Sequence, residues 1–578
     1  MTQKNGSRPT SRLTSIGLQN FQSFADYQDI PIAPLTFLYG PNSSGKSALI
    51  DAMRLIEFYW SPASKEYGPF AIAGPSRNNR LTRDWRRVRD DKPVPGQVVL
   101  AATVDADSRF LSATPGFSSQ KTKLKELVGD VNIQSCASTS GRYQAMAKLG
   151  FIPDGNGDPR FWTTMSVLIE VAGSPCVRLV EQDRFELNLR HPLLRGIATK
   201  LPNALRLSRE DDSPFTREGD WLTYKGMTAF DDETPRVDSY MTALISDIED
   251  ARPGQAVEYM WDAIDEMAEV FNAVITAVSS TVHAAVQGLR VPASRVVPSR
   301  ESVTYHFPSV FYDSDNEWPS DRRLGHIPVA PDGDDSYRAL ARGCAGEYMN
   351  LVMDVLRTRE GSIFDQMTGM GTGLLASVNA SLREHLFLDR AYQVAAKVAT
   401  LVDGDAFAAR ARDGFDEDTY LKNCSLIVSL ALTDPDGRRF WFDEVGSGIG
   451  YVLPVLIAAQ SKGQCVIEQP ELHLHPALQA ALGDVFAEAM NCGTSLVVES
   501  HSEHVLLRVL KRIRQTTAAK PIAETLRLGS DHVGVLYFEP RMDGSTLVRR
   551  LRISPEGDFM DRWPAGFFAE RDQELFDE

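Results

Sequence analysis

The feature that most constrains this chain is the octapeptide GPNSSGKS at residues 40–47. It fits the pattern Gly-x-x-x-x-Gly-Lys-Ser/Thr, in which glycines let successive backbone N–H groups turn inward around phosphate oxygens. A strand-like apolar run, PLTFLYG (34–40), precedes it, and ALIDAMRLIEFYW, with apolar residues at helical spacing, follows it. The positive end of such a helix favours an anion. The sequence therefore predicts a phosphate-binding loop.

The residues of this loop have expected roles. Lys46 would bridge the β- and γ-phosphates of a nucleoside triphosphate, and Ser47 would ligate Mg²⁺. ATP and Mg²⁺ are thus the predicted cofactors. The loop residues expected to contact the nucleotide are Gly40, Pro41, Asn42, Ser43, Ser44, Gly45, Lys46, Ser47 and Ala48.

Length and composition limit the class of protein. With 578 residues, two or three structural units are expected. A net charge of -16 argues against a protein whose whole surface coats nucleic acid. The six cysteines lack a CxxC pair, which predicts reduced thiols. No run approaches the roughly 18 apolar residues of a membrane span, and no apolar core follows the basic N-terminus. We therefore expect a cytoplasmic protein without a membrane partner.

The first half of the chain predicts an antiparallel sheet followed by a helical insert. Apolar or alternating runs at 98–106, 161–172 and 177–189 suggest neighbouring strands. Between Val257 and Val282, apolar residues recur at steps of three and four, which predicts a long amphipathic helix. We read that helix first as packing on its own domain, and second as a dimer or partner surface.

The second half predicts an α/β domain. After about residue 420, strand-like and helical runs alternate, which favours a parallel sheet with crossovers. One buried strand, in CVIEQPELHLHP (465–476), ends on Glu468, a candidate Mg²⁺ ligand. The expected divisions are an N-terminal lobe (1–189), a helical insert (190–290), a linker and helical part of the second lobe (291–420), a C-terminal lobe (421–540) and a tail (541–578).

The large separation of Lys46 from Glu468, with LQNFQSF near the start, resembles the ABC-type ATPase heads of the RecF, SMC and OLD families. This resemblance implies an α/β head built from both chain ends, with an antiparallel β subdomain and an inserted helical region. It places Gln22 and Ser23 beside the nucleotide, although the related heads often carry Arg or Lys where this chain has Gln22.

The resemblance also implies a dimer. DEVGSGIGYVLPVL (443–456) resembles the signature motif, whose Gly446, Ser447 and Gly448 would face the γ-phosphate bound by a second subunit. ATP would then complete a head-to-head pair, with higher multiples also open. VVESHSEHVLLR (497–508) resembles the switch segment, with His501 placed to sense the γ-phosphate; a structural histidine is the alternative.

One departure from these heads concerns hydrolysis. They usually carry Asp-Glu where this chain has Glu468-Gln469, and a glutamine cannot accept a proton at neutral pH. Gln469 could position water while phosphate takes the proton. Glu468 or Glu471 could instead be the base, or turnover could be nearly absent. We expect slow hydrolysis. His473 and His475 have no third ligand nearby, so a structural role is favoured over zinc.

Two basic stretches are candidates for contact with DNA, RNA or a partner, although charged faces are usually just solvated. Phosphate contacts require such clusters of positive charge. The candidate residues are Arg77, Arg80, Arg83, Arg86, Arg87, Arg89, Lys511 and Arg512.

EQPELHLHP, ESHSEH and a closing WPAGFF resemble bacterial stand-alone ATPases, some of which belong to antiphage systems such as Septu and PARIS. That resemblance implies an ATPase that controls a separate nuclease or toxin. Only a short segment without an acidic constellation follows His501, so an intrinsic nuclease of the OLD type is not expected. Two other functions stay open: a RecF-like DNA repair ATPase, and a nucleotide-sensing scaffold with negligible turnover.

Overall fold

The computed structural model describes residues 11–59, 88–89, 92–93, 97–107, 141–153, 162–180, 184–188, 190–192, 215–225, 288–291, 304–307, 351, 373–386, 392–401, 425–440, 447–461 and 463–563. The chain divides into two compact units. Unit 1 contains Met1–Ile32, Gly40–Gln287 and Tyr537–Arg550, and unit 2 contains Ala33–Tyr39, Gly288–Leu536 and Leu551–Glu578. Each unit joins segments from the two ends of the chain, which confirms the expectation that distant parts of the sequence fold together.

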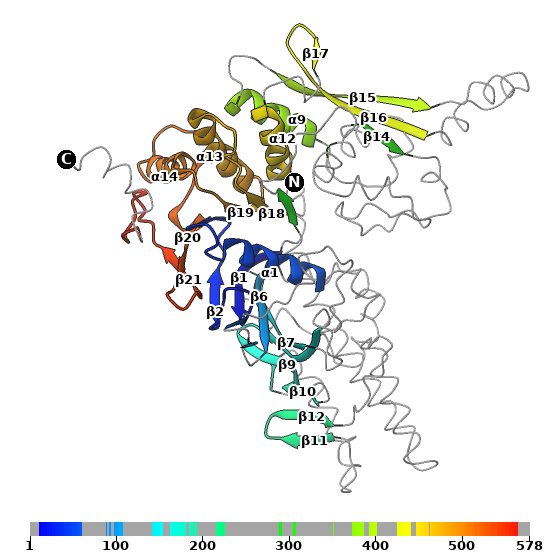
Figure 1. The fold of residues 1–578 in the computed structure, drawn as a ribbon, viewed down its shortest axis with the longest axis vertical. Helices are drawn as coiled ribbons and strands as arrows, with labels where there is room; N and C mark the ends of the chain where they lie inside the picture. Colours follow the sequence, from blue (N-terminus) through cyan, green and yellow to red (C-terminus); the bar gives the residue numbers. More distant parts are fainter. Residues whose placement is uncertain are drawn as a thin grey trace, which may run out of the picture. The chain divides into compact units, whose positions relative to one another are not determined.

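Unit 1 contains a nine-stranded sheet in the order β11-β12-β10-β9-β8-β7-β6-β1-β2 (Figure 1). Its neighbouring strands pair antiparallel. Every second residue of β7 from Tyr143 to Phe151 is buried, the period expected of a strand with one face on a core. The strands are β1 (Ser11–Gln19), β2 (Gln28–Pro31), β6 (Val98–Asp107), β7 (Arg142–Pro153), β8 (Trp162–Val171), β9 (Ser174–Val180), β10 (Arg184–Asn188), β11 (Phe215–Glu218) and β12 (Trp221–Lys225).

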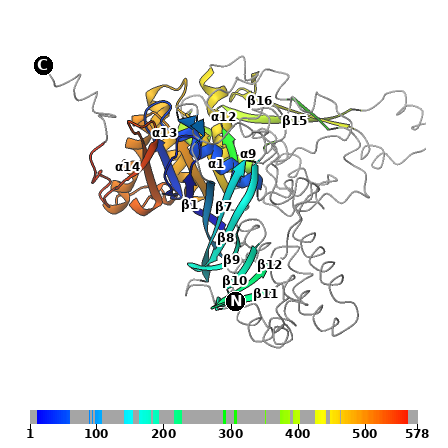
Figure 2. The same cartoon turned by 60° about the horizontal axis from the view of Figure 1, so that its bottom comes forward.

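This sheet extends further than the sequence predicted. The run at 177–189 is two strands, β9 and β10, paired as a hairpin. The hairpin β11–β12 lies inside the expected helical insert (190–290), yet it adds to the sheet edge through β10 (Figure 2). The amphipathic helix expected between Val257 and Val282 lies outside the described residues.

The second sheet has six strands in the order β13-β18-β19-β3-β20-β21, and β20 is divided between the two units. The first four run parallel, as predicted from alternating strands and helices. Every residue of β3 is buried, as expected of a central parallel strand. The strands are β13 (Gly288–Val291), β18 (Gly463–Glu468), β19 (Thr494–Glu499), β3 (Leu35–Tyr39), β20 (Val533–Pro540) and β21 (Thr546–Leu551).

Two helices of unit 2 pack on the parallel strands, and a third packs on one of these helices. Helix α12 (Ser447–Gln460) contacts β13, β18 and β19, and α13 (Pro476–Asn491) contacts β19 and β3. Helix α14 (Glu503–Thr517) packs on α13 with one apolar face, which includes Val505, Val509 and Ile513. Within the described residues, no helix combines the length and apolarity that a bilayer crossing requires.

A third sheet lies in unit 2, in the order β14-β16-β15, with β17 paired to β16. The expected hairpin of the runs SLIVSLALTD and RRFWFDEV is confirmed by the antiparallel pair Leu432↔Phe440. β15 was not predicted, although it pairs with β16 along its whole length. The elements are β14 (Thr304–Phe307), β15 (Gln393–Leu401), β16 (Ser425–Thr433), β17 (Arg439–Phe440), helix α9 (Leu374–Ser381) and the π-helical turn η7 (Leu382–Leu386).

Candidate functional site

The predicted phosphate loop follows β3 and leads into α1 (Lys46–Tyr59). Lys46 is 3% exposed, and its Nζ donates to the carbonyls of Gly40 and Pro41, each at 2.9 Å. Gly40 (φ 147°) and Gly45 (φ 101°) hold conformations that residues with a Cβ rarely adopt. The buried Ser44 Oγ finds no hydrogen-bond partner in the part of the chain that the structure describes. A buried ammonium, a glycine-dependent turn and an unsatisfied hydroxyl fit the phosphates of a nucleotide.

The remaining loop residues divide between solvent and core. Pro41, Asn42, Ser43 and Ser47 are exposed, whereas Ala48 is buried in α1. The Ser47 hydroxyl is therefore accessible at the start of the helix, where a ligand of Mg²⁺ is expected.

A brace supports this loop within unit 1. Thr546 on β21 is 2% exposed; its Oγ1 donates to the Ser44 carbonyl at 2.8 Å, and its backbone N–H donates to the Ser23 carbonyl at 2.8 Å. Gln28 Nε2 donates to the Thr546 carbonyl at 2.6 Å. A Cβ on Gly45 would lie 2.5 Å from Ser23 Oγ and 2.6 Å from Thr546 Oγ1. Sequence reasoning missed Thr546, because no motif marks it.

The turn that carries Gln22 is anchored by two aromatic side chains. Phe21 and Phe24 are fully buried and exchange backbone hydrogen bonds at 3.0 and 2.8 Å. Gln22 between them takes a left-handed conformation (φ 47°), and its Nε2 donates to Asp51 Oδ2 on α1 at 3.3 Å. Gln22 and Ser23 therefore contact α1 and the loop brace, respectively, and their place beside the nucleotide stays a prediction.

In unit 2, the parallel strands end side by side at the residues expected to serve Mg²⁺ and water. Glu468 at the end of β18 is in register with Glu499 of β19, which pairs with Leu38 of β3. Gln469 then turns sharply (φ 48°), and its N–H donates to the Glu499 carbonyl at 2.7 Å. Both Glu468 and Gln469 are half-buried. Ligands of open α/β sheets bind outside the carboxyl ends of such strands.

Glu471 joins this turn to the predicted switch segment. Its Oε1 accepts from the His501 backbone N–H at 2.6 Å, and its Oε2 accepts from Ser500 Oγ at 2.9 Å. Burial raises the pKa of the Glu471 carboxyl, and the hydrogen bond from the His501 backbone opposes that shift in part. The structure thus brings together Glu468, Gln469, Glu471 and His501, four of the five residues predicted to be catalytic.

A second link joins the end of β3 to the start of α14. The Tyr39 hydroxyl donates to the Ser502 carbonyl at 3.1 Å, and burial followed by the charge of Glu471 raises the pKa of Tyr39. Ser502 Oγ donates to Gln479 Oε1 at 2.7 Å and accepts from the Val505 N–H, which makes it the N-cap of α14. Trp563 of the closing motif packs edge-on against the Tyr39 ring, with centroids 5.8 Å apart.

The predicted signature motif leads into α12. The helix begins at Ser447, and Gly446 lies outside the described residues. A Cβ on Gly448 would lie 3.4 Å from the His473 carbonyl, so the helix start comes close to the chain that follows β18. The His473 ring packs against the ring of Tyr451 on α12 in a tilted arrangement, with centroids 4.6 Å apart.

His475 caps α13. Its Nδ1 accepts from the Ala477 N–H at 3.3 Å, and Pro476 occupies the first helical position, where its missing N–H costs nothing. Both histidines of the LHLHP segment therefore have structural contacts, as the sequence favoured.

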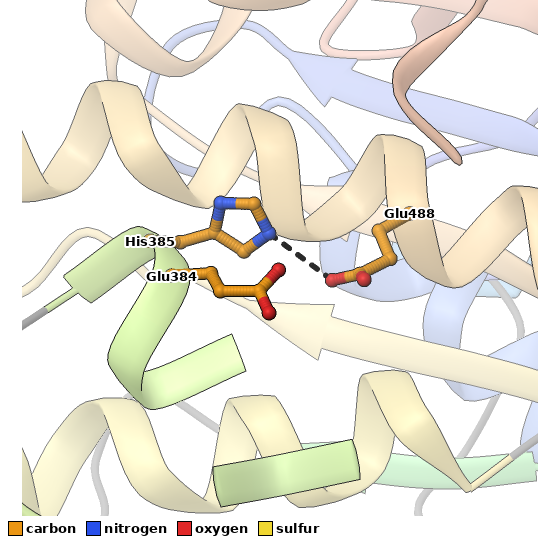
Figure 3. A group of neighbouring side chains, drawn as sticks. All are labelled: Glu384, His385 and Glu488. Carbon is orange, nitrogen blue, oxygen red and sulfur yellow. Dashed lines mark hydrogen bonds and ion pairs between the residues drawn. The ribbon is translucent and has the colours of Figure 1, made fainter. Parts of the chain in front are cut away.

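A polar cluster on another face of α13 gathers Glu384, His385 and Glu488 (Figure 3). His385 Nε2 and Glu488 Oε2 are 3.1 Å apart, and Ser381 Oγ donates to the same carboxylate oxygen at 3.1 Å. The hydrogen bond with His385 lowers the pKa of Glu488. The three side chains offer ligand atoms within 4.8 Å of one another. In this structure the cluster connects η7 to α13.

The basic candidates have different surroundings. Lys511 is exposed on α14, whereas Arg512 donates to the buried Asp484 on α13 at 2.6 and 2.9 Å. Arg508 pairs with the same carboxylate. Arg512 is thus engaged in helix packing. Arg89 lies in the short strand β4 (Val88–Arg89), which pairs with β5 (Lys92–Pro93). The other five arginine candidates, at 77, 80, 83, 86 and 87, lie outside the described residues.

In comparisons with known protein families, two separate parts of the chain find a match. Residues 13–56 match a family described as the P-loop containing region of an AAA domain. Residues 364–508 match a family described as an AAA domain, putative AbiEii toxin, type IV toxin–antitoxin system. A search of curated proteins finds no match.

Solved structures with a detectable likeness include SMC head domains. The head from Thermotoga maritima has 10% identity and a TM-score of 0.32, and the match covers 94% of this chain and 100% of that chain. The head from Pyrococcus furiosus, with an extended coiled coil and bound to the C-terminal domain of ScpA, has 10% identity and a TM-score of 0.33, with 94% and 97% covered.

The first family match contains the phosphate loop, and the second contains Glu468, Glu471 and His501. These matches identify a P-loop ATPase, in two regions that lie far apart in the sequence and that each match an AAA-domain family.

Proposed function

We propose that this chain binds ATP·Mg²⁺, hydrolyses it slowly, and uses the bound nucleotide mainly to hold two copies head to head. The observation that carries the proposal is Gln469. It directly follows the predicted Mg²⁺ ligand Glu468, at the position where the heads that this chain resembles place a carboxylate.

The residues present suit ATP and Mg²⁺. Gly40 follows Tyr39, the last residue of β3, and β3 is separated from β18 by β19 alone. This order supports a site in which the phosphate loop and Glu468 serve one nucleotide. Lys46 and the loop N–H groups would hold the phosphates, and Ser47 and Glu468 would hold Mg²⁺, which neutralises charge on the γ-phosphate.

Slow turnover follows from the chemistry of the neighbouring side chains. The Gln469 amide can orient a water molecule but cannot accept its proton, so the γ-phosphate would have to take it. Glu471 is buried, and both of its oxygens already accept hydrogen bonds. The half-buried Glu468 is assigned to the metal ion.

The dimer would depend on the start of α12. A helix N-terminus favours negative charge, and Ser447 and Gly448 open this helix. In the proposed pair, residues 446–448 of one copy would complete the γ-phosphate site of the other. This arrangement makes ATP binding, rather than its hydrolysis, the event that assembles the complex.

The biological role that we propose is control of a separate effector, such as a nuclease or toxin, in antiphage defence. It is supported by the EQPELHLHP, ESHSEH and WPAGFF motifs and by the toxin–antitoxin description of the family that matches residues 364–508. A RecF-like repair ATPase and a nucleotide-sensing scaffold are the competing functions, and the experiment below separates them.

The test is native mass measurement of the chain, co-expressed with its genomic neighbours, with and without ATP·Mg²⁺. We expect the mass of the complex to increase with ATP to that of a dimer or a higher multiple carrying a second protein, and we expect no such increase in Lys46→Ala.

The steady-state rate of ATP hydrolysis should lie below the ordinary value of about 10 s⁻¹. A fast rate that Lys46→Ala abolishes would refute slow hydrolysis. ATP-dependent DNA binding without a partner would favour the repair function, and binding without any turnover would favour the scaffold.

A further inference from the structure

We propose that Glu471 is a positioning residue that holds residues 500–502 of the switch segment in place, and that it is not the base that activates water. This inference rests on the proposed function, because it assigns His501 to the γ-phosphate of bound ATP. It removes one of the two glutamates that the sequence left as candidate bases.

The hydrogen bonds of Glu471 lead from the Mg²⁺ strand to the start of a helix. Its two oxygens accept from the His501 N–H and from Ser500 Oγ. Ser500 Oγ in turn accepts from the Ser502 N–H at 3.0 Å, and Ser502 caps α14. One carboxylate thus fixes three consecutive residues of the switch segment, directly or through one hydroxyl.

Glu471 reinforces a contact made by Gln469. The Gln469 N–H donates to the Glu499 carbonyl at 2.7 Å, one residue before Ser500. The chain that follows β18 is therefore tied to the last residue of β19 through Gln469, and to His501 through Glu471. His501 cannot shift along the strand axis without disturbing the turn that presents Gln469. The sensing residue and the water-orienting residue would move as one body.

A base would need a free lone pair directed at water, and the geometry of Glu471 serves another purpose. The Glu471 residue is 9% exposed, and each carboxylate oxygen accepts a hydrogen bond from the switch segment. A glutamine of the same shape could keep both contacts, since its carbonyl can accept from the His501 N–H and its amide can donate to Ser500 Oγ. It could not act as a base.

The test compares Glu471→Gln with Glu471→Ala by two measurements. The first is amide hydrogen exchange of peptides containing His501, without nucleotide, so that it does not depend on hydrolysis. The second is the single-turnover rate with ATP·Mg²⁺. Glu556→Ala, an exposed glutamate in unit 2, is the matched control. We expect Glu471→Ala to speed exchange of the His501 amide by about tenfold or more, the range for a lost hydrogen bond to a charged group.

Glu471→Gln should keep the His501 amide within about threefold of the original exchange rate and retain most of the hydrolysis. Loss of hydrolysis in Glu471→Gln, with the amide still protected, would identify Glu471 as the base and overturn the inference. Unchanged exchange in Glu471→Ala would overturn it as well.

Two further results keep the test independent of the proposed function. If the original chain binds ATP but does not hydrolyse it, slow hydrolysis fails while the exchange series still decides the role of Glu471. If Glu471→Ala does not fold, Ser500→Ala replaces it: this variant removes one of the two contacts and should speed exchange at Ser502 while sparing the His501–Glu471 bond. Exchange at Ser502 that stays unchanged in Ser500→Ala would refute the connection.

Discussion

The brace on the phosphate loop makes Thr546→Val the most informative substitution outside the motifs. Valine has nearly the shape of threonine, so packing is retained while the donor to the Ser44 carbonyl is lost. Thr546 is 2% exposed and its bond to that carbonyl is 2.8 Å long, so water cannot readily replace the hydroxyl. The Ser44 carbonyl would be left buried without this donor, at a cost of about 1–3 kcal/mol.

This cost translates into nucleotide affinity. If the relaxed loop must return to its original conformation to hold phosphate, the same free energy weakens binding. At about 1.4 kcal/mol per tenfold, the dissociation constant for ATP should rise by roughly 5- to 150-fold. The assay is titration with a fluorescent ATP analogue in the presence of Mg²⁺, alongside urea unfolding to measure the change in stability of the free protein.

Thr546→Ser provides the control, because it keeps the hydroxyl and removes only a methyl group, worth about 0.8 kcal/mol. We expect its nucleotide affinity to stay close to that of the original chain. Affinity within twofold for Thr546→Val, together with an unchanged urea midpoint, would show that the loop does not depend on β21, and the reasoning would be refuted.

Three other changes test separate parts of the structure. Asp484→Ala should destabilise the protein by about 3 kcal/mol in urea unfolding, because it leaves two arginines of α14 without their buried partner; a loss below 1 kcal/mol would contradict this. His475→Ala should cost about 1 kcal/mol through the lost cap of α13 and leave zinc content, measured by mass spectrometry, unchanged. Because the folded pKa of Glu488 lies below its unfolded value, its stabilising contribution is present above the unfolded pKa and is lost as pH falls through the folded pKa. In Glu488→Gln, the urea unfolding midpoint should therefore decrease less steeply at acidic pH. An unchanged pH dependence would contradict the stabilising role of the Glu488 carboxylate.

Local pattern predicted the elements that carry the phosphate loop and the parallel sheet. The Gly-x-x-x-x-Gly-Lys-Ser motif between an apolar strand and an amphipathic helix is a signal contained in one segment. The alternation of strand-like and helical runs after residue 420 likewise predicted β18, α13, β19 and α14. These elements could be predicted because each requires only the residues within it and its immediate flanks.

Residues held by distant partners could not be predicted in this way. Thr546 contacts the loop through a pairing with a segment at the other end of the chain, and its own neighbours in sequence carry no motif. Glu471 was placed among candidate bases because its type and position allowed that role; only the structure shows that each of its oxygens accepts a hydrogen bond from the switch segment. The hairpin β11–β12 was missed because its strands are short and are stabilised by addition to β10.

The central position of β3 has a consequence for biosynthesis. This strand is synthesised long before its neighbours in the sheet, β19 and β20, which come much later in the chain. β3 is fully buried in the folded protein, but during translation both of its edges lack a partner strand until β19 and β20 have been made. An unpaired apolar strand of this kind is prone to aggregation. Truncated products that stop before β19 should therefore bind chaperones, because their β3 has no partner strand.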